Sequence, residues 1–330
     1  MVRSVRILSS VLLVCFFTVL AFAQSSGEIV VPRGYKAPLI ERSESLRVVL
    51  EKAVSETLAA FSEKGWKQEE ISVTVIDLRD PVKWQMGEVR GEQQMYPASV
   101  PKMFYMVALQ QQLETGKVKL TSELARGEKD MIVDSSNEAT QYVLDVITLT
   151  SSGAELPEKQ FQEWQYKRNR VNRYLTAMGY RNINVNQKTF CEDAYGIEQQ
   201  SRGYKGQNRN MLTTNATARQ MAEIVTGRVG TPGRTRAMMD LLKRDPFAPT
   251  KDPDDQAHGF TGKILIDRKM TDAKLWSKAG WTSRARHDAA YIETSDGLKF
   301  VIVVFTENHA GEKEVIPMVA GKVMDGLSKN

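Results

Sequence analysis

The chain has 330 residues, 42% of them hydrophobic and 26% charged, proportions that exclude a disordered, collagen-like or coiled-coil protein. The formal net charge is only +5 and no block of basic residues concentrates it, which argues against a nucleic-acid-binding protein. Two cysteines cannot form a disulfide framework. The three histidines, His258, His287 and His309, lack ligand spacing, so we expect no metal and no cofactor.

Residues 1–23 have the pattern of a secretory signal peptide. Two arginines precede an apolar run over 7–22, and Ala21-Phe22-Ala23 would direct cleavage before Gln24. We therefore expect a periplasmic or secreted protein without a membrane span after cleavage. The alternative is an uncleaved membrane anchor, for which the run is somewhat short. Cleavage would lower the net charge from +5 to +3 and leave Cys191 as the single cysteine.

The predicted elements begin after a stretch over 24–42 that contains proline and glycine, is not periodic, and is interpreted as a tether. Apolar residues at helical spacing predict a helix over 43–63, and alternation predicts a strand over 71–76 with a partner starting at 84–86. Further helices are predicted over 101–114, 137–146, 171–178 and 216–226. The polar stretch 180–210 has neither period, and a segment of that length usually carries function.

The C-terminal part is predicted as two strands, 288–293 and 300–306, joined by a hairpin turn and followed by a helix over roughly 312–327. This order indicates an α+β fold of three layers (α/β/α). An antiparallel sheet would come from both chain ends, with a helical subdomain over roughly 100–225 inserted between its halves. We expect one catalytic domain over 43–330, and a monomer.

Three short motifs carry the chemistry. Ser99-Val100-Pro101-Lys102 is an S-x-x-K motif at the start of an apolar helix, so Lys102 lies about one turn from Ser99 on the same face. A neutral lysine can accept the proton of a serine nucleophile. Taken alone, the motif is weak, because Ser99 could equally be a helix N-cap. Ser135-Ser136-Asn137 opens a later helix, and Lys278-Ala279-Gly280 precedes the C-terminal strands.

In that order, the motifs resemble the S-x-x-K, S-D-N and K-T-G motifs of the penicillin-recognising serine hydrolases, and of class A β-lactamases most closely. The resemblance covers roughly residues 43–328, apart from an extra segment near 151–168. It implies a β-lactamase/transpeptidase-like fold and a covalent acyl-enzyme. The substrate would be a small-molecule β-lactam or a peptidoglycan stem peptide.

Carried over by position, the resemblance makes Ser99 the nucleophile and Lys102 its base. Ser135 would pass a proton to the leaving nitrogen, and Asn137 would hold Lys102 and the amide side chain of the substrate. Lys278 would supply positive charge near Ser135 and toward the substrate carboxylate. The backbone N–H groups of Ser99 and Trp281, which follows Gly280, would form the oxyanion hole.

The chain departs from the family in both later motifs. Ser136 replaces aspartate, and Ala279 replaces a threonine whose hydroxyl would bind the substrate carboxylate. Thr282, with Arg284 and Arg286, is a candidate to take over that contact. The arginines could equally be surface charges.

The largest departure is the absence of an E-x-x-L-N pattern, whose glutamate activates the deacylating water in class A β-lactamases. Glu192 is the one reasonable substitute, although it could equally be a solvated loop acid. Three functions therefore remain open: a β-lactamase acting through a Ser99 acyl-enzyme, a D-alanyl-D-alanine peptidase-like enzyme that deacylates slowly, and a noncatalytic binding or sensor protein.

Overall fold

The structure is a computed structural model that describes residues 27–329, so the expected signal peptide lies outside the described residues. Its centre is a sheet of seven strands in the order β1-β3-β2-β7-β6-β5-β4. The strands are β1 (Ile40–Arg42), β2 (Ile71–Asp77), β3 (Trp84–Val89), β4 (Lys243–Arg244), β5 (Lys274–Trp281), β6 (Ala285–Glu293) and β7 (Lys299–Glu307). All neighbouring strands are antiparallel except β1, which pairs parallel to β3 and makes the sheet mixed at one edge.

The two chain ends meet in the middle of this sheet, as expected. Strand β2 pairs with β7 from Ile71 opposite Thr306 to Asp77 opposite Phe300. Successive residues of β7 enter different cores, because side chains alternate between the two faces of a sheet. One core receives Phe300, Ile302 and Val304, and the other receives Val301, Val303 and Phe305. Both faces of the sheet are therefore covered by helices.

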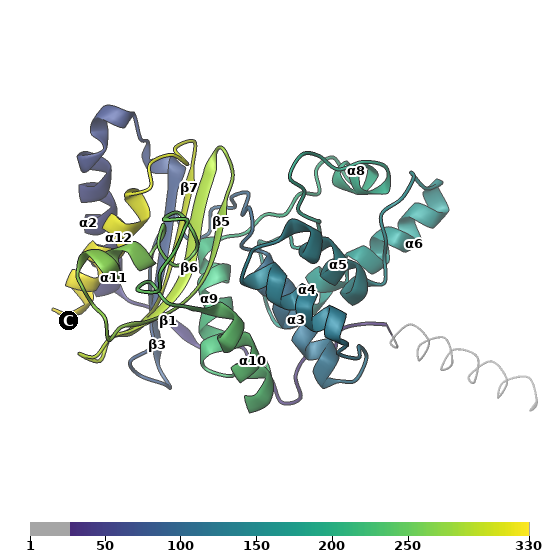
Figure 1. The fold of residues 1–330 in the computed structure, drawn as a ribbon, viewed down its shortest axis with the longest axis horizontal. Coiled ribbons are helices and arrows are strands. Elements are labelled where there is room, and N and C mark those ends of the chain that lie inside the picture. The colour runs from purple at the N-terminus through teal and green to yellow at the C-terminus, as the bar shows by residue number, and fades with distance from the viewer. Residues whose placement is uncertain (1–26, 330) are drawn as a thin grey trace, which may run out of the picture.

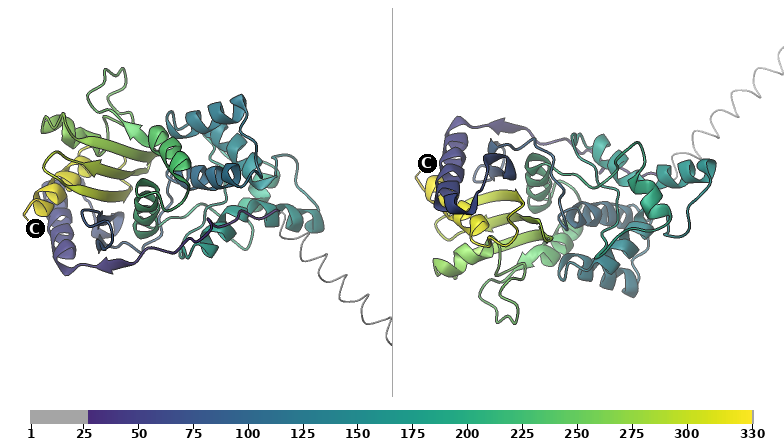
Figure 2. Two further views of the ribbon diagram at one scale, coloured as in Figure 1. Left: turned by 90° about the horizontal axis from the view of Figure 1, so that it is seen from below. Right: turned by 90° about the horizontal axis from the view of Figure 1, so that it is seen from above.

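Helices α2 (Glu44–Ala60), α11 (Gly262–Asp267) and α12 (Val315–Leu327) cover one face, and α9 (Thr214–Val225) and α10 (Pro232–Leu242) lie on the other (Figures 1 and 2). Beyond α9 and α10 lies a helical part, as the α+β prediction required. It comprises α3 (Lys102–Glu114), α4 (Ser122–Ile132), α5 (Asn137–Thr148), α6 (Glu158–Arg168), α7 (Arg170–Ala177) and α8 (Ile197–Arg202). Two short 3-10 helices, Ser62–Lys64 and Gln68–Glu70, lead into β2.

Helix α3 lies at the centre of the helical part and is buried on every side. Its residues from Lys102 to Leu113 are all buried, including three consecutive glutamines. Amphipathic spacing is therefore absent, and the helix is held by packing on all faces. Its N-terminal end faces the sheet at β5, which brings the S-x-x-K and K-x-G motifs together.

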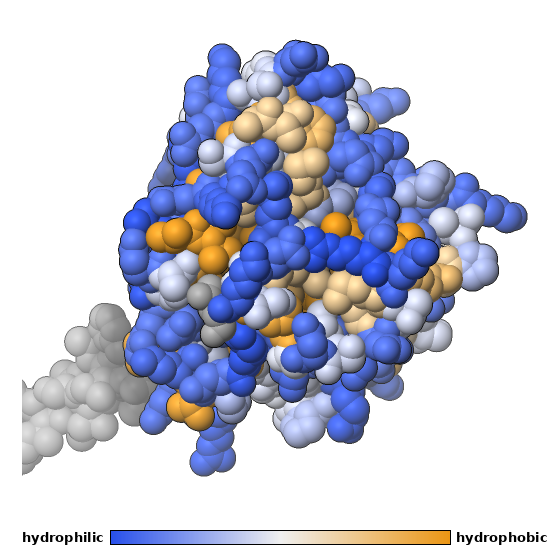
Figure 3. Space-filling model, turned by 90° about the vertical axis from the view of Figure 1, so that its left-hand side faces the viewer, coloured by the Kyte–Doolittle hydropathy of each residue, from blue (hydrophilic) through white to orange (hydrophobic). Residues whose placement is uncertain are grey.

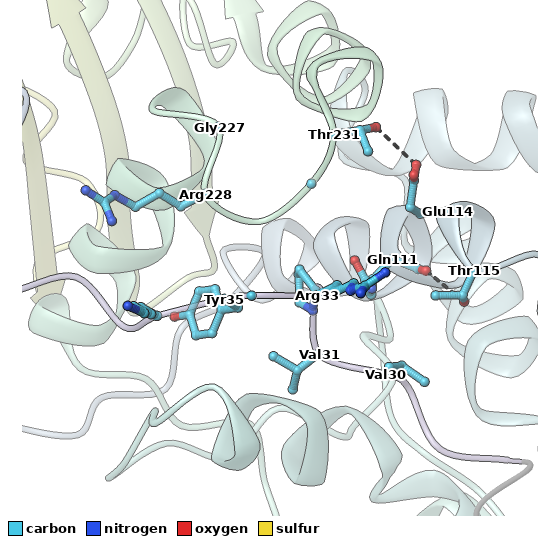
Figure 4. Close-up of a pocket in the computed structure, with 14 residues that line it drawn as sticks. Val30, Val31, Arg33, Tyr35, Gln111, Glu114, Thr115, Gly227, Arg228 and Thr231 are labelled. Carbon is cyan, nitrogen blue, oxygen red and sulfur yellow. Dashed lines mark hydrogen bonds between the residues drawn. The ribbon is translucent and has the colours of Figure 1, made fainter.

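Residues 27–42 differ from the expected tether, because they pack against the domain. Ile29 is buried, Glu28 forms an ion pair with Arg173 of α7 at 2.7 Å, and the Tyr35 hydroxyl donates to Glu223 of α9 at 2.5 Å. Figure 4 shows Val31, Arg33 and Tyr35 lining a pocket with residues of α3 and of the loop after α9. In Figure 2 the segment runs from the helical part to the edge of the sheet, where it becomes β1.

The stretch 180–210, predicted as a functional loop, contains only α8 and two isolated bridges as regular structure. Buried charges fasten it to the helices. Arg168 of α6 bonds both carboxylate oxygens of Glu198 at 2.7 and 2.8 Å, and Lys188 lies 2.6 Å from Asp145 of α5. Arg168 and Glu198 are at most 1% exposed. Because breaking a buried pair is costly, this network holds the loop in place.

The surface over α2 and α12 is mostly hydrophilic, with small hydrophobic areas between the charged side chains (Figure 3). Val48 of α2 contributes one of the exposed apolar side chains. Within residues 27–329, no helix has the length and apolar character needed to cross a bilayer.

Candidate active site

Ser99 lies in the turn that leads into α3 and is half-buried. The Lys102 N–H donates to the Ser99 carbonyl at 3.2 Å, so the two residues are one tight turn apart, as the motif predicts. Ala98, just before the nucleophile candidate, has φ +47°, a left-handed conformation that residues with a side chain rarely adopt. Such local strain is common at functional sites.

Lys102 is fully buried and held by the second motif. Its Nζ donates to Asn137 Oδ1 at 2.8 Å, to the Ser135 carbonyl, and more weakly to Ser135 Oγ at 3.3 Å. Burial lowers the pKa of Lys102 to about 7, although Glu138 and Cys191 favour the charged form and partly oppose the shift. A substantial fraction of this lysine is therefore a neutral amine near pH 7.

The substitution at Ser136 preserves a structural role. Ser136 is the N-cap of α5, and its Oγ accepts from the Ala139 N–H at 3.1 Å. Serine and aspartate are comparably good N-caps, so serine can replace the aspartate of the family motif without loss of the helix start. The cap holds α5 in register and so positions Asn137. Ser135 adopts φ +57°, which turns it toward both lysines.

Lys278 is fully buried on β5, the last strand but one of the sheet. The edge strand β4 pairs with Leu275 and Trp276 only, so it ends before Lys278 is reached. Lys278 Nζ donates to Ser135 Oγ at 3.0 Å, to Gln256 Oε1 at 2.7 Å and to the Ala279 carbonyl at 2.6 Å. Burial lowers its pKa, and the charge of Lys102 lowers it further. Ser135 thus lies between two lysines whose charges repel each other.

Gly280 brings β5 into direct contact with the nucleophile turn. A Cβ atom at this position would lie 2.7 Å from the Ser99 nitrogen and 2.9 Å from the Pro97 carbonyl oxygen. Only glycine permits this approach, because both neighbouring atoms belong to the backbone. Trp281, the next residue, is 44% exposed, and its ring packs against Phe260.

The candidates for binding a substrate carboxylate have different surroundings. Thr282 Oγ1 accepts from the N–H groups of Arg284 and Ala285, so it shapes the turn between β5 and β6. Arg284 is exposed and donates to Asn308 at 2.7 Å. Arg286 is only 3% exposed, pairs with Asp254, and lies over the ring of Phe260. The idea that Arg286 binds substrate is therefore wrong, because an internal carboxylate already holds it.

Glu192 is exposed and lies beside the site rather than in its centre. Its neighbour Cys191 is the residue that meets the catalytic group, because Asn137 Nδ2 donates to Cys191 Sγ at 3.4 Å. In residues 27–329, no carboxylate oxygen lies within hydrogen-bond distance of Lys102 or Asn137.

Three residues at the site were missed by sequence reasoning. Gln256 accepts from Lys278 and the Ala279 N–H and donates to the carbonyls of Ile132 and Val133, which links β5 to the end of α4. Cys191 was interpreted as a small, partly buried side chain. His287 supports the nucleophile turn, since its Nε2 lies 2.9 Å from the Tyr96 carbonyl. None belongs to a motif, so the sequence carried no signal for these contacts.

Comparisons with known proteins agree with this geometry. The model of the β-lactamase enzyme family matches residues 50–325. Among solved structures, a β-lactamase from Sphaerobacter thermophilus superposes with a TM-score of 0.60 at 17% identity, covering 84% of this chain and 98% of that chain. A variant of the TLA-1 extended-spectrum β-lactamase gives a TM-score of 0.61 at 14% identity, with 84% and 99% covered.

A variant of PBP-A in an acyl-enzyme complex with penicillin G gives a TM-score of 0.58 at 16% identity, with 88% of this chain and 98% of that chain covered. A search of curated protein sequences found no match. The structural likenesses establish the β-lactamase/transpeptidase-like fold, and the family model covers most of the chain. The chain therefore belongs to the β-lactamase enzyme family.

Proposed function

We propose that this protein is an exported serine hydrolase that forms an acyl-enzyme at Ser99 with β-lactams and with peptidoglycan stem peptides, and that it releases the acyl group slowly. The observation that carries the proposal is the buried Lys102, one turn from Ser99, with a pKa of about 7. A lysine kept largely neutral near pH 7 is suited to act as a general base. Export is included because residues 1–23 have the pattern of a signal peptide.

In the proposed acylation step, neutral Lys102 takes the proton of the Ser99 hydroxyl as Oγ attacks the carbonyl carbon. The N–H groups of Ser99 and Trp281 donate to the oxyanion that forms. When the C–N bond breaks, Ser135 gives its proton to the leaving nitrogen and regains one from protonated Lys102. The distance from Lys102 Nζ to Ser135 Oγ, 3.3 Å, suits this relay. Lys278 favours an anionic group at the same side of Ser135.

Slow release is proposed because hydrolysis of the acyl-enzyme needs a base that activates water. Glu192 is exposed and has no hydrogen bond within the described residues to Lys102 or Asn137. The position against Asn137 is taken by the thiol of Cys191. A thiol with an ordinary pKa near 8.5 is a poor substitute for a carboxylate in this task at pH 7.

A second candidate is an efficient β-lactamase, which the description of the matching family favours. In that case Glu192, or another group of the 180–210 loop, would have to reach the acyl-enzyme. A noncatalytic binding protein of the same fold is the third candidate.

The test is to follow the intact mass of the protein during incubation with benzylpenicillin. We expect a one-to-one adduct that persists while the drug is consumed only stoichiometrically. Rapid catalytic consumption would instead indicate a β-lactamase, and no adduct would indicate a binding protein. Ser99→Ala should abolish the adduct, whereas the matched control Ser295→Ala, in an exposed hairpin turn, should keep it. Lys102→Ala should slow acylation severely. An adduct that persists in Ser99→Ala would refute the nucleophile assignment.

A further inference from the structure

A pocket of about 840 Å³ adjoins the candidate active site. Each of its walls belongs to a segment that also builds the site. Tyr96 precedes the nucleophile turn, Cys191 accepts the hydrogen bond from Asn137, and Thr282 follows Trp281. The pocket is thus continuous with the site rather than a separate cavity.

The position of the pocket indicates which part of a substrate it would receive. Lys278, proposed to face the carboxylate on the leaving-group side, is not among the lining residues. Asn137, expected to hold the amide side chain on the acyl side, contacts Cys191 in the pocket wall. A group that extends from the acyl side of the substrate past Asn137 therefore enters this pocket.

Two arginines of the pocket are held by neutral partners. Arg284 Nη2 donates to Asn308 Oδ1 at 2.7 Å, and Asn308 in turn donates to Glu70 at 2.9 Å. The guanidinium of Arg209 lies 4.9 Å from the centre of the Tyr96 ring. Within the described residues neither forms an ion pair, whereas Arg202 in the same pocket pairs with Asp193. Arg209 and Arg284 are thus held in place while their charges stay available.

The pocket also contains Glu192 and Glu307. Among the described residues no hydrogen bond holds either carboxylate. The charges that are positioned in advance are therefore the positive ones, and a guanidinium matches a planar carboxylate in geometry as well as charge. A ligand that meets fixed groups loses less entropy on binding than one that must order them.

We propose that this pocket is a subsite for a carboxylate on the acyl side of the substrate, bound by Arg209 and Arg284. The inference rests on the proposed function and narrows its substrate class. Acyl donors with an anionic side chain are preferred over neutral ones, and over those with an ammonium group at the same position.

Three penicillins test this directly, because they differ only in the group on the carbon next to the side-chain carbonyl. Benzylpenicillin has hydrogen there, carbenicillin a carboxylate and ampicillin an ammonium. We expect the second-order acylation rate constant for carbenicillin to exceed that for benzylpenicillin by about three- to tenfold at low salt, and ampicillin to be the slowest. Raising the salt concentration should reduce the preference, because the pocket is open to solvent.

In the double variant Arg209→Gln with Arg284→Gln, the ratio of carbenicillin to benzylpenicillin should fall to about one. The control Arg236→Gln removes an equal kind of charge from exposed α10, distant from the lining residues, and should leave the ratio unchanged. If ampicillin reacts fastest, or if the double variant keeps the ratio, the subsite does not exist.

Binding to Ser99→Ala separates this inference from the proposed function. Calorimetry with the same three penicillins measures affinity without acylation. The same order of affinity, carbenicillin first, supports the subsite even if the wild type forms no adduct. Adduct formation by the wild type with equal affinities in Ser99→Ala would leave the proposed function standing and overturn the subsite.

Discussion

The contact between Gly280 and the nucleophile turn leads to a sharp prediction for Gly280→Ala. The added methyl group would lie 2.7 Å from the Ser99 nitrogen, 2.9 Å from the Pro97 oxygen and 3.1 Å from the Val100 nitrogen. All three are backbone atoms, so no side chain can rotate away. Relief requires the turn and β5 to separate by roughly 0.5–1 Å to restore ordinary van der Waals distances.

That separation affects both stability and acylation. Overpacking of this kind costs about 1–3 kcal/mol. It also moves the Ser99 N–H relative to the Trp281 N–H, and a misplaced oxyanion hole reduces the rate by about 100-fold or more. We therefore expect Gly280→Ala to remain folded, with a melting temperature lower by several degrees, and to acylate about 100-fold more slowly.

The assay is the rate of adduct formation with benzylpenicillin by intact mass, alongside thermal unfolding. Gly233→Ala is the matched control, because a Cβ atom at Gly233 meets nothing within 4 Å and the residue lies in α10. It should acylate normally and gain up to about 1 kcal/mol of helix stability. Acylation of Gly280→Ala at the wild-type rate would refute the role assigned to this close approach.

Three further predictions follow from the site and its supports. Acylation should accelerate with rising pH through about 7, about tenfold per pH unit below it, because protonated Lys102 cannot accept the Ser99 proton; a flat profile from pH 5 to 8 would contradict this. Burial lowers the pKa of His287 to about 4, so the unfolded state takes up the proton first as pH falls below 6.5, and stability should drop by about 3 kcal/mol between pH 6.5 and 4; urea unfolding should show a smaller drop in His287→Gln. Ser136→Ala should lose about 1 kcal/mol in the same unfolding assay, and Ser136→Asp should lose little, because only the former removes the N-cap of α5.

The catalytic candidates could be found from the sequence because short-range geometry positions most of them. Ser99 and Lys102 are one turn apart, and Ser135 and Asn137 flank a helix start, so local spacing alone relates the members of each pair. The elements on which they lie also have clear periodicity. The strands 288–293 and 300–306 were predicted within a few residues of β6 and β7.

The remaining contacts could not be predicted, because they join segments far apart in the chain. Gln256 lies in an irregular stretch, yet it bridges β5 and α4 through four hydrogen bonds. Arg286 and Arg284 are two residues apart on or beside β6, and the alternation of strand faces turns one inward to Asp254 and leaves the other in the pocket. Position along the chain does not reveal which of two such arginines meets an internal carboxylate.

The packing of residues 27–42 has a practical consequence for where the folding unit begins. The family model starts matching at residue 50, and the sequence pattern placed the domain start at 43. A chain shortened to either point would lose β1, leave Glu223 without the Tyr35 hydroxyl, and separate Arg173 from Glu28. An expressed fragment should therefore begin at or before residue 27, and a protease that cuts between 28 and 40 would release a part of the core rather than a leader.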